Sequence, residues 1–149
     1  MVVANHRVVT IVAILILTAL ISTFFLLKSS HPTVRLPDGT VIAVEIADSP
    51  KERRIGLSDH IFLDPDRGML FLLDGLSRPA FWMKDMRFPI DIVWLRERVV
   101  VGIQPSLQPT TVENPPSVRP ASDITEVLEV NAGFAAKHHL KIGDELSYE

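Results

Sequence analysis

The sequence predicts a β-rich α+β domain with a curled antiparallel or barrel-like sheet and two short helices, preceded by one transmembrane helix. Three observations lead to this prediction. Residues 8–27 are uncharged, short apolar segments alternate in the manner of β-strands, and only two stretches carry helix-capping signals. A barrel-like closure is favoured because it protects strand edges from unwanted pairing.

The N-terminal run over residues 8–27 contains no Asp, Glu, Lys, Arg or His and is bracketed by Arg7 and Lys28. Twenty helical residues span roughly 30 Å, which is the thickness of the hydrocarbon core of a bilayer. The alternative is a cleaved signal peptide, but its apolar core is usually shorter and is followed by a small-x-small cleavage site, which is missing here. We therefore expect a tail over residues 1–7, an uncleaved anchor over 8–27, a linker over 28–32 and one folded domain over 33–149.

Composition excludes several classes of function. The chain has 15 Lys and Arg against 18 Asp and Glu and no basic run, so it is a poor candidate for binding nucleic acid. The absence of Cys excludes disulfides, thiol nucleophiles and Cys-ligated metals. No metal-ligand spacing, phosphate-binding glycine loop, dinucleotide fingerprint or nucleophile elbow occurs. We expect no metal and no cofactor, and the sequence carries no recognisable catalytic motif.

The first half of the domain has two clear local signals. Residues 33–36 and 40–47 flank Pro37-Asp38-Gly39, which predicts a β-hairpin. Ser49, Pro50 and Glu52 form the start signal of a helix that we expect to run to about residue 57, with Gly56 placed to end it.

The later elements follow from apolar patterning and turn residues. Residues 68–73 are apolar on both faces and predict a central strand covered on both sides. The proline-rich residues 104–123 predict a long surface loop. The other expected elements are strands at 79–84, 90–95 and 99–103 in an antiparallel meander, a strand at 125–130, a helix at 132–140 capped by Asn131, and a last strand at 145–148.

Several short motifs occur in order between residues 33 and 148. They are Gly56-Leu57, Gly68-Met69-Leu70-Phe71, Phe81-Trp82-Met83-Lys84, Pro89-Ile90-Asp91-Ile92, Val127-Leu128-Glu129-Val130-Asn131-Ala132-Gly133 and Ile142-Gly143-Asp144. With these motifs the chain resembles the domain of unknown function 192 (DUF192) family.

The resemblance implies a compact β-rich domain, often preceded by a signal or an anchor, and no established activity. It favours a single-pass membrane protein with an extracytoplasmic domain, although the charges beside the apolar run leave its orientation undecided. Where the family commonly has Gly-Leu-Met and then an Arg two residues later, this chain has Gly56-Leu57-Ser58-Asp59-His60. A function that depends on that Arg would not transfer.

Asp91 is the first candidate site residue because it interrupts the apolar residues 90–95. A carboxylate in apolar surroundings must find a partner or be pushed towards protonation. Lys84 is the nearest cation across the expected hairpin, and it pairs with Asp91 only if the two residues lie opposite each other. Asp91 is either a ligand-binding group or general base, or a structural residue that is ion-paired or bonded to the backbone.

Trp82 shares a strand face with Lys84, whereas Phe81 and Met83 share the other face. An indole beside a polar group suits the stacking of sugars or planar ligands. The alternative is a Trp buried beneath the stem of the Lys. The expected ligand-binding residues are therefore Trp82, Lys84 and Asp91.

Three functional hypotheses follow. The first is a membrane-anchored, extracytoplasmic binding or accessory module of the cell envelope, with a small ligand, a glycan or an envelope protein as partner. The second is an acid–base hydrolase in which Asp91 is the base and Lys84 positions an anion. The third is a structural or interaction domain without a ligand site, which would present an apolar surface to its partner.

Overall fold

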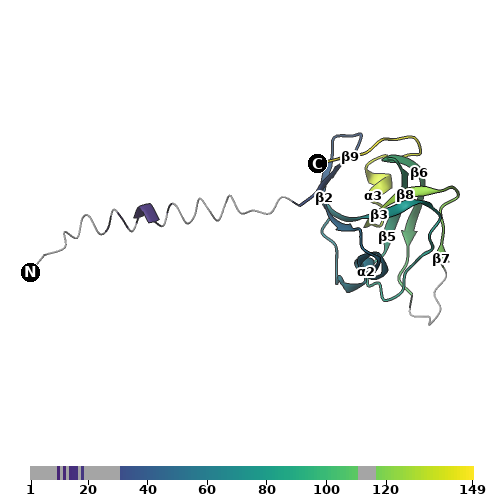
Figure 1. Ribbon diagram of the computed structural model, residues 1–149, viewed down its shortest axis with the longest axis horizontal. Helices are drawn as coiled ribbons and strands as arrows, with labels where there is room; N and C mark the ends of the chain where they lie inside the picture. Colours follow the sequence, from purple (N-terminus) through teal and green to yellow (C-terminus); the bar gives the residue numbers. More distant parts are fainter. Residues whose placement is uncertain (1–9, 11, 13, 17, 19–30, 111–116) are drawn as a thin grey trace, which may run out of the picture. The chain divides into compact units, whose positions relative to one another are not determined.

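The computed structural model describes residues 10, 12, 14–16, 18, 31–110 and 117–149 (Figure 1). The chain divides into two units, residues 1–30 and 31–149. The described residues of the first unit are helical. The second unit holds the folded domain, with strands in one seven-stranded and one two-stranded sheet and a few short helices.

The predicted transmembrane helix is wrong for the part of the chain that the structure describes, where no helix is long and apolar enough to cross a membrane. A span needs about 20 consecutive apolar helical residues, and the described helical positions within residues 8–27 are only 10, 12, 14–16 and 18. The rest of that run and residues 28–30 lie outside the described residues. The predicted signal anchor and single-pass location, and the extracytoplasmic placement that went with them, are therefore not supported.

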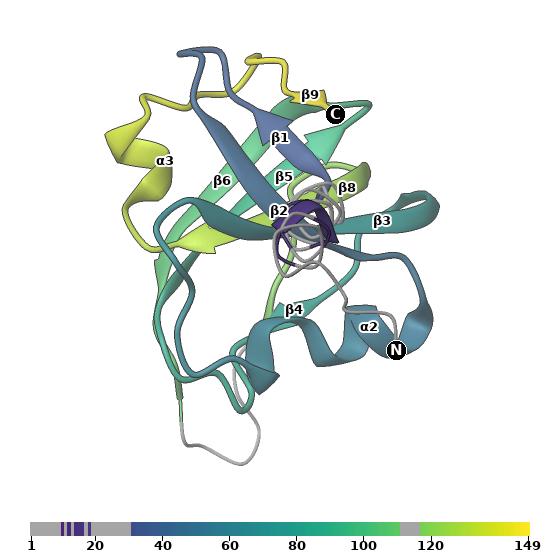
Figure 2. The same cartoon turned by 90° about the vertical axis from the view of Figure 1, so that its left-hand side faces the viewer.

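The main sheet has the strand order β6-β5-β8-β3-β2-β1-β9 and curls into a half-barrel (Figure 2). Its strands are β1 (Thr33–Arg35), β2 (Val41–Ala47), β3 (Arg67–Ser77), β5 (Ile90–Arg96), β6 (Val99–Leu107), β8 (Ile124–Asn131) and β9 (Ser147–Tyr148). The β-rich α+β class with a curled sheet is confirmed.

The C-terminal segment joins the two edges of the curled sheet. The N–H of Val100 in β6 donates to the carbonyl of Asp144 over 2.8 Å, and Leu146 donates to Arg98 over 2.9 Å. The next residues, in β9, pair with β1, where Val34 lies opposite Tyr148. Both edge strands thereby gain partners for their backbone groups, as the edge-protection argument requires.

The predicted antiparallel meander is confirmed for residues 90–95 and 99–103, which pair as β5 and β6, and is wrong for residues 79–84. β2 and β3 are parallel, because the chain between them forms a helix that carries it back across the sheet. β5 pairs with β8 as well as with β6. Within residues 79–84, which were expected to join the meander, β4 (Phe81–Trp82) pairs instead with β7 (Ser117–Val118) in a separate sheet.

The proline-rich loop predicted for residues 104–123 is also shorter than expected, because β6 extends to Leu107 and β7 lies within it. Pro105 is tolerated in β6 because that strand is at the edge of the sheet, where a missing N–H breaks no ladder.

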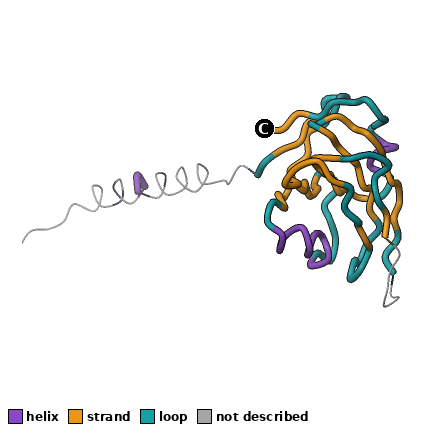
Figure 3. The backbone as a smooth tube through the Cα atoms, turned by 45° about the vertical axis from the view of Figure 1, so that its right-hand side comes forward, coloured by secondary structure: helices purple, strands orange, loops and turns teal. Residues whose placement is uncertain are grey.

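Three central strands, β3, β5 and β8, are buried on both faces. On β5, Val93 and Leu95 face the interior of the half-barrel, together with residues of the short helix α3 (Phe134–Lys137). Ile92 and Trp94 face outward into a second apolar cluster. The doubly covered strand predicted at residues 68–73 is confirmed. Figure 3 shows the curled sheet with its helices on different sides.

Helix α2 (Pro50–Ile55) covers part of the outer cluster and continues into the 3-10 helix η1 (Gly56–Asp59). The predicted capping box is confirmed. The N–H of Glu52 donates to the hydroxyl of Ser49 over 3.2 Å, and the N–H of Ser49 donates to the carboxylate of Glu52 over 3.0 Å. Gly56 ends the helix with a φ of 53°, which favours glycine.

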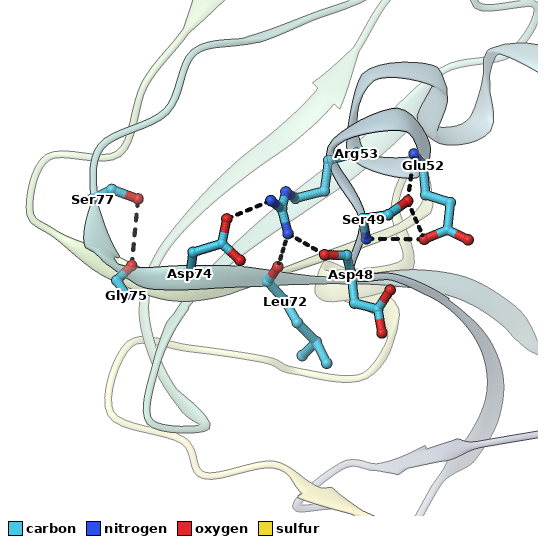
Figure 4. A network of polar contacts seen from close by, with 8 residues as sticks. All are labelled: Asp48, Ser49, Glu52, Arg53, Leu72, Asp74, Gly75 and Ser77. Atoms are coloured by element: carbon cyan, nitrogen blue, oxygen red, sulfur yellow. Dashed lines mark hydrogen bonds and ion pairs between the residues drawn. The ribbon is translucent and has the colours of Figure 1, made fainter.

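Arg53 holds α2 against β3 (Figure 4). Its guanidinium donates to the carbonyls of Asp48 and Leu72, the latter over 2.8 Å, and to the carboxylate of Asp74 over 2.6 Å. Asp74 is 84 % exposed and Arg53 17 %, so the ion pair itself contributes little. The bonds to the two carbonyls fix the distance between helix and strand.

Replacing Arg53 with Lys tests this contact. An ammonium cannot satisfy three acceptors spread over a planar fork, so Arg53→Lys is expected to lower the free energy of unfolding by about 1–2 kcal/mol. Urea denaturation measures the change. Arg54→Lys is the matched control, because Arg54 is exposed and makes no hydrogen bond or ion pair with a described residue. Equal effects of the two substitutions would contradict the role given to Arg53.

Candidate functional site

A cavity of about 340 Å³, here called the α2 pocket, lies against the outer face of the sheet. Its walls come from α2, η1, β3 and the segment from Pro79 to Met86, and Glu129 of β8 reaches it from the sheet. The volume is at the small end of the range for pockets that bind small molecules, about 300–1,000 Å³. Its apolar lining includes Leu57, Phe71, Leu73, Phe81 and Met86.

Glu129 reaches the α2 pocket because of the register of β8. On this strand Leu128 and Val130 face the interior of the half-barrel, whereas Val127 and Glu129 face outward. Glu129 lies between Met69 on one neighbouring strand and Ile92 on the other. It is therefore surrounded by apolar side chains and is only 6 % exposed.

Gly56 lies over the carboxyl group of Glu129. A Cβ atom at this position would be 3.9 Å from Oε2 of Glu129 and 3.3 Å from Cζ of Phe71. Gly56 therefore adopts the positive φ that ends α2 and leaves room for the ring of Phe71, which a Cβ atom would approach to 3.3 Å.

Burial raises the pKa of Glu129 to about 8, because a charged carboxylate is poorly solvated in an apolar site. Among the residues that the structure describes, none donates a hydrogen bond to its carboxyl group or forms an ion pair with it. At pH 7 the group is mostly a neutral acid, able both to donate and to accept a hydrogen bond. A largely buried carboxyl group with a raised pKa at a cavity is a candidate functional group.

Two of the predicted site residues, Trp82 and Lys84, line the α2 pocket. Trp82 is 50 % exposed and Met83 3 %. Lys84 is exposed too, but it lies in a turn after β4, so the two residues do not share a strand face as predicted. Phe81 anchors β4 by edge-to-face contacts with Phe71 and Trp94, with ring centroids 5.4 and 5.3 Å apart. The indole of Trp82 is thereby held at the mouth of the pocket.

Asp91, the third predicted residue, lies elsewhere. It is 1 % exposed and is on the face of β5 that points into the half-barrel, away from the α2 pocket. Its Oδ1 accepts hydrogen bonds from the N–H of Ser106 over 2.8 Å and of Gly133 over 3.0 Å, and its Oδ2 accepts one from Ala135 over 2.9 Å. The geometry is that of the backbone-bonded Asp considered as the structural alternative.

The ion pair considered between Asp91 and Lys84 does not form, because β4 pairs with β7 and not with β5. Asp91 instead satisfies free N–H groups at the start of α3. The cap predicted at Asn131 is wrong: its side-chain amide donates to the carbonyls of Leu63 and Asp64, over 2.9 and 3.2 Å.

Glu129, Arg54 and Gly56 are among the pocket residues that were not predicted as site residues. A signal for Glu129 exists in the sequence, because it interrupts the apolar strand Val127-Leu128-Glu129-Val130 as Asp91 interrupts its own. Arg54 and Gly56 carry no comparable signal, since their role depends on how α2 packs.

A second polar cluster joins the β1–β2 turn to α3. Nδ1 of His138 is 2.9 Å from the carboxylate of Asp38 and 3.2 Å from the hydroxyl of Thr40. Both contacts use the same ring nitrogen, so the ring cannot relay a proton between them. Within residues 31–110 and 117–149, no group of three or more His, Asp or Glu side chains could hold a metal ion.

The curled sheet and the pocket on its outer face define a small α+β domain of a class without an assigned activity. The family model of DUF192, described as an uncharacterized ACR, matches residues 33–148. The chain belongs to the DUF192 family.

Two solved structures are similar to this chain. One is a protein of unknown function from Novosphingobium aromaticivorans DSM 12444, 28% identical, with a TM-score of 0.70 over 81% of this chain and 89% of that chain. The other, named as a candidate transcription regulator from Sinorhizobium meliloti 1021, is 26% identical, with a TM-score of 0.69 over 78% of this chain and 91% of that chain. No curated protein matches the chain.

The substitution Asp91→Asn tests whether Asp91 anchors the start of α3 through its hydrogen bonds to backbone N–H groups. The amide turns one acceptor into a donor that faces backbone N–H groups, so Asp91→Asn is expected to lower the free energy of unfolding by about 2–4 kcal/mol. Urea denaturation at pH 7 measures this, with Asp123→Asn at an exposed position as control. An unchanged stability would contradict the anchoring role.

The raised pKa of Glu129 predicts how stability depends on pH. The folded pKa of about 8 is above the ordinary value of 4.5. The stability linked to this proton is therefore fully present below about pH 4.5 and is lost as the pH rises to about 8. The loss is on the order of a few kcal/mol.

Glu129→Gln keeps a neutral polar group and removes the proton. It is expected to unfold at higher urea than the wild type at pH 8, with the difference shrinking towards pH 4.5. Glu145→Gln, at an exposed position, serves as the control. Parallel stability curves for Glu129→Gln and the wild type across this pH range would show that Glu129 titrates normally.

Proposed function

We propose that this domain binds a small ligand in the α2 pocket. The proposal is supported mainly by one observation: Glu129, which is only 6 % exposed, lines an apolar cavity, and no described residue bonds to its carboxyl group. A ligand group that forms a hydrogen bond with this carboxyl group is held in a largely apolar site, where such a bond is stronger than in water.

Trp82 and Lys84 support the same site from the mouth of the pocket. Half of the surface of the indole is exposed, although Trp is a residue that folding usually buries. An exposed, anchored aromatic side chain beside a concave apolar surface is typical of small-molecule recognition. Asp91 has no part in this proposal, because its oxygens are occupied by three backbone N–H groups.

The proposal favours a ligand with an apolar body over a glycan. The walls of the pocket are mostly apolar, whereas a sugar needs several placed donors and acceptors. The hydrolase hypothesis loses its proposed base, since a base must reach the substrate and Asp91 points into the half-barrel. The third hypothesis, an interaction domain without a ligand site, gives no reason for a pocket beside Glu129.

The neutral fluorescent probe N-phenyl-1-naphthylamine tests whether the α2 pocket binds small apolar molecules. The wild-type protein is expected to bind it saturably, and to lose at least ten-fold in affinity when Ala80→Trp fills the pocket, of which Ala80 is a lining residue. Ala136→Trp, exposed on α3, is expected to bind as the wild type does.

Amide chemical-shift changes show where the probe binds. Shifts clustered at Gly56, Phe81 and Glu129 are the expected result. Equal binding by the Ala80 and Ala136 variants, or shifts centred on the exposed side chains of Ile61 and Phe62, would contradict the proposed site.

A further inference from the structure

We infer that the ligand of the α2 pocket is a small organic acid. Its apolar body fills the cavity, its anionic group lies at the mouth beside Arg54 and Lys84, and its inner end carries a hydroxyl or carbonyl group that pairs with Glu129. The inference rests on the proposed function and assigns the ligand class of the same site.

The apolar body follows from the walls. Leu57, Phe71 and Leu73 form one side of the pocket, and Phe81 and Met86 come from the segment that carries Trp82. Burial of apolar surface gains about 25 cal/mol per Å². The cavity of about 340 Å³ is at the small end of the range for small-molecule pockets, about 300–1,000 Å³, so it suits a ligand of no more than two or three rings.

The anionic group follows from the charges around the pocket. Arg53, Arg54 and Lys84 line it, and the charge of Arg53 is compensated by Asp74 at 2.6 Å. Arg54 and Lys84 form no ion pair with any residue that the structure describes. Of the described residues that line the pocket, Glu129 alone is acidic, and it is mostly neutral at pH 7.

The pocket therefore presents two uncompensated positive charges to a ligand and almost no negative charge. Low-dielectric walls strengthen such a field, so an acid is attracted and an amine is repelled. Because both cations are exposed to solvent, each is expected to change affinity only a few-fold, and added salt is expected to weaken the effect.

The hydrogen-bonding inner group follows from Glu129. An apolar ligand group placed against the carboxyl group of Glu129 would leave both of its oxygens without a hydrogen-bond partner. The free-energy cost of the unpaired oxygens is larger than the gain from burying a small apolar group there. A hydroxyl or carbonyl oxygen of the ligand accepts a hydrogen bond from the O–H of the neutral carboxyl group, and a ligand hydroxyl can also donate a hydrogen bond to its other oxygen. A ligand that lacks this group is expected to bind less tightly.

A series of four compounds of matched size tests the ligand class. They are 3-(4-hydroxyphenyl)propionate, 3-phenylpropionate, 3-phenylpropanol and 3-phenylpropylamine, each used to displace N-phenyl-1-naphthylamine at pH 7. The expected order of affinity is the order given, with at least ten-fold between 3-phenylpropionate and the amine. At 0.5 M NaCl the difference between 3-phenylpropionate and 3-phenylpropanol is expected to shrink.

Two variants test separately how the pocket recognises the anionic group and the hydroxyl group of the ligand. The double substitution of Arg54 and Lys84 by Gln is expected to bring 3-phenylpropionate to the affinity of the alcohol, with each affinity calculated from that variant's own affinity for the probe. Lys51→Gln, exposed on α2 and outside the pocket, is expected to change neither. Glu129→Leu is expected to abolish the preference for the hydroxylated acid and to keep the preference for acid over amine.

The outcomes separate this inference from the proposed function. If the probe binds in the α2 pocket and the four compounds bind equally, in the reverse order or not at all, the inference is overturned and the proposed function stands. If Ala80→Trp leaves probe binding unchanged, the proposed function fails with it.

Discussion

The whole structure depends on the burial of β3, β5 and β8 on both faces. Closing the half-barrel covers one apolar face of these strands, and the outward face still has to be shielded from water. Among the described residues, α2, η1 and the segment around β4 cover part of that second face. Arg53 ties α2 to β3. The α2 pocket lies between these covering elements and the sheet.

Much of the fold could be predicted from local patterns. The hairpin around Pro37-Asp38-Gly39, the capping box at Ser49 and the doubly buried strand at residues 68–73 are each set by neighbouring residues. The strand order could not be predicted, because pairing of β5 with β8 and of β4 with β7 depends on long-range packing. The membrane prediction treated hydropathy as sufficient, yet a span also requires a long helix, which the described residues lack.

Two of the three predicted site residues, Trp82 and Lys84, line the α2 pocket. Alternation in a strand accounts for the exposure of Trp82 in β4 but not for that of Lys84, which lies in the turn that follows. Asp91 was chosen by a rule that is correct in itself: a carboxylate in an apolar strand needs a partner. That rule cannot say whether the partner is the backbone or a ligand. Applied to Glu129, the same rule finds a carboxyl without a described partner, because β8 turns this residue towards the outer cover and Asp91 faces the interior.

The central claim is that Glu129 is a neutral acid at an apolar cavity at pH 7. The most direct test is a titration of the side-chain carboxyl carbon of Glu129 by NMR, with ¹³C-labelled glutamate and Glu129→Gln for assignment. The account predicts a midpoint near the pKa of about 8. A midpoint near 4.5, the ordinary value, would mean that water or a cation reaches the carboxylate freely, and it would contradict the account.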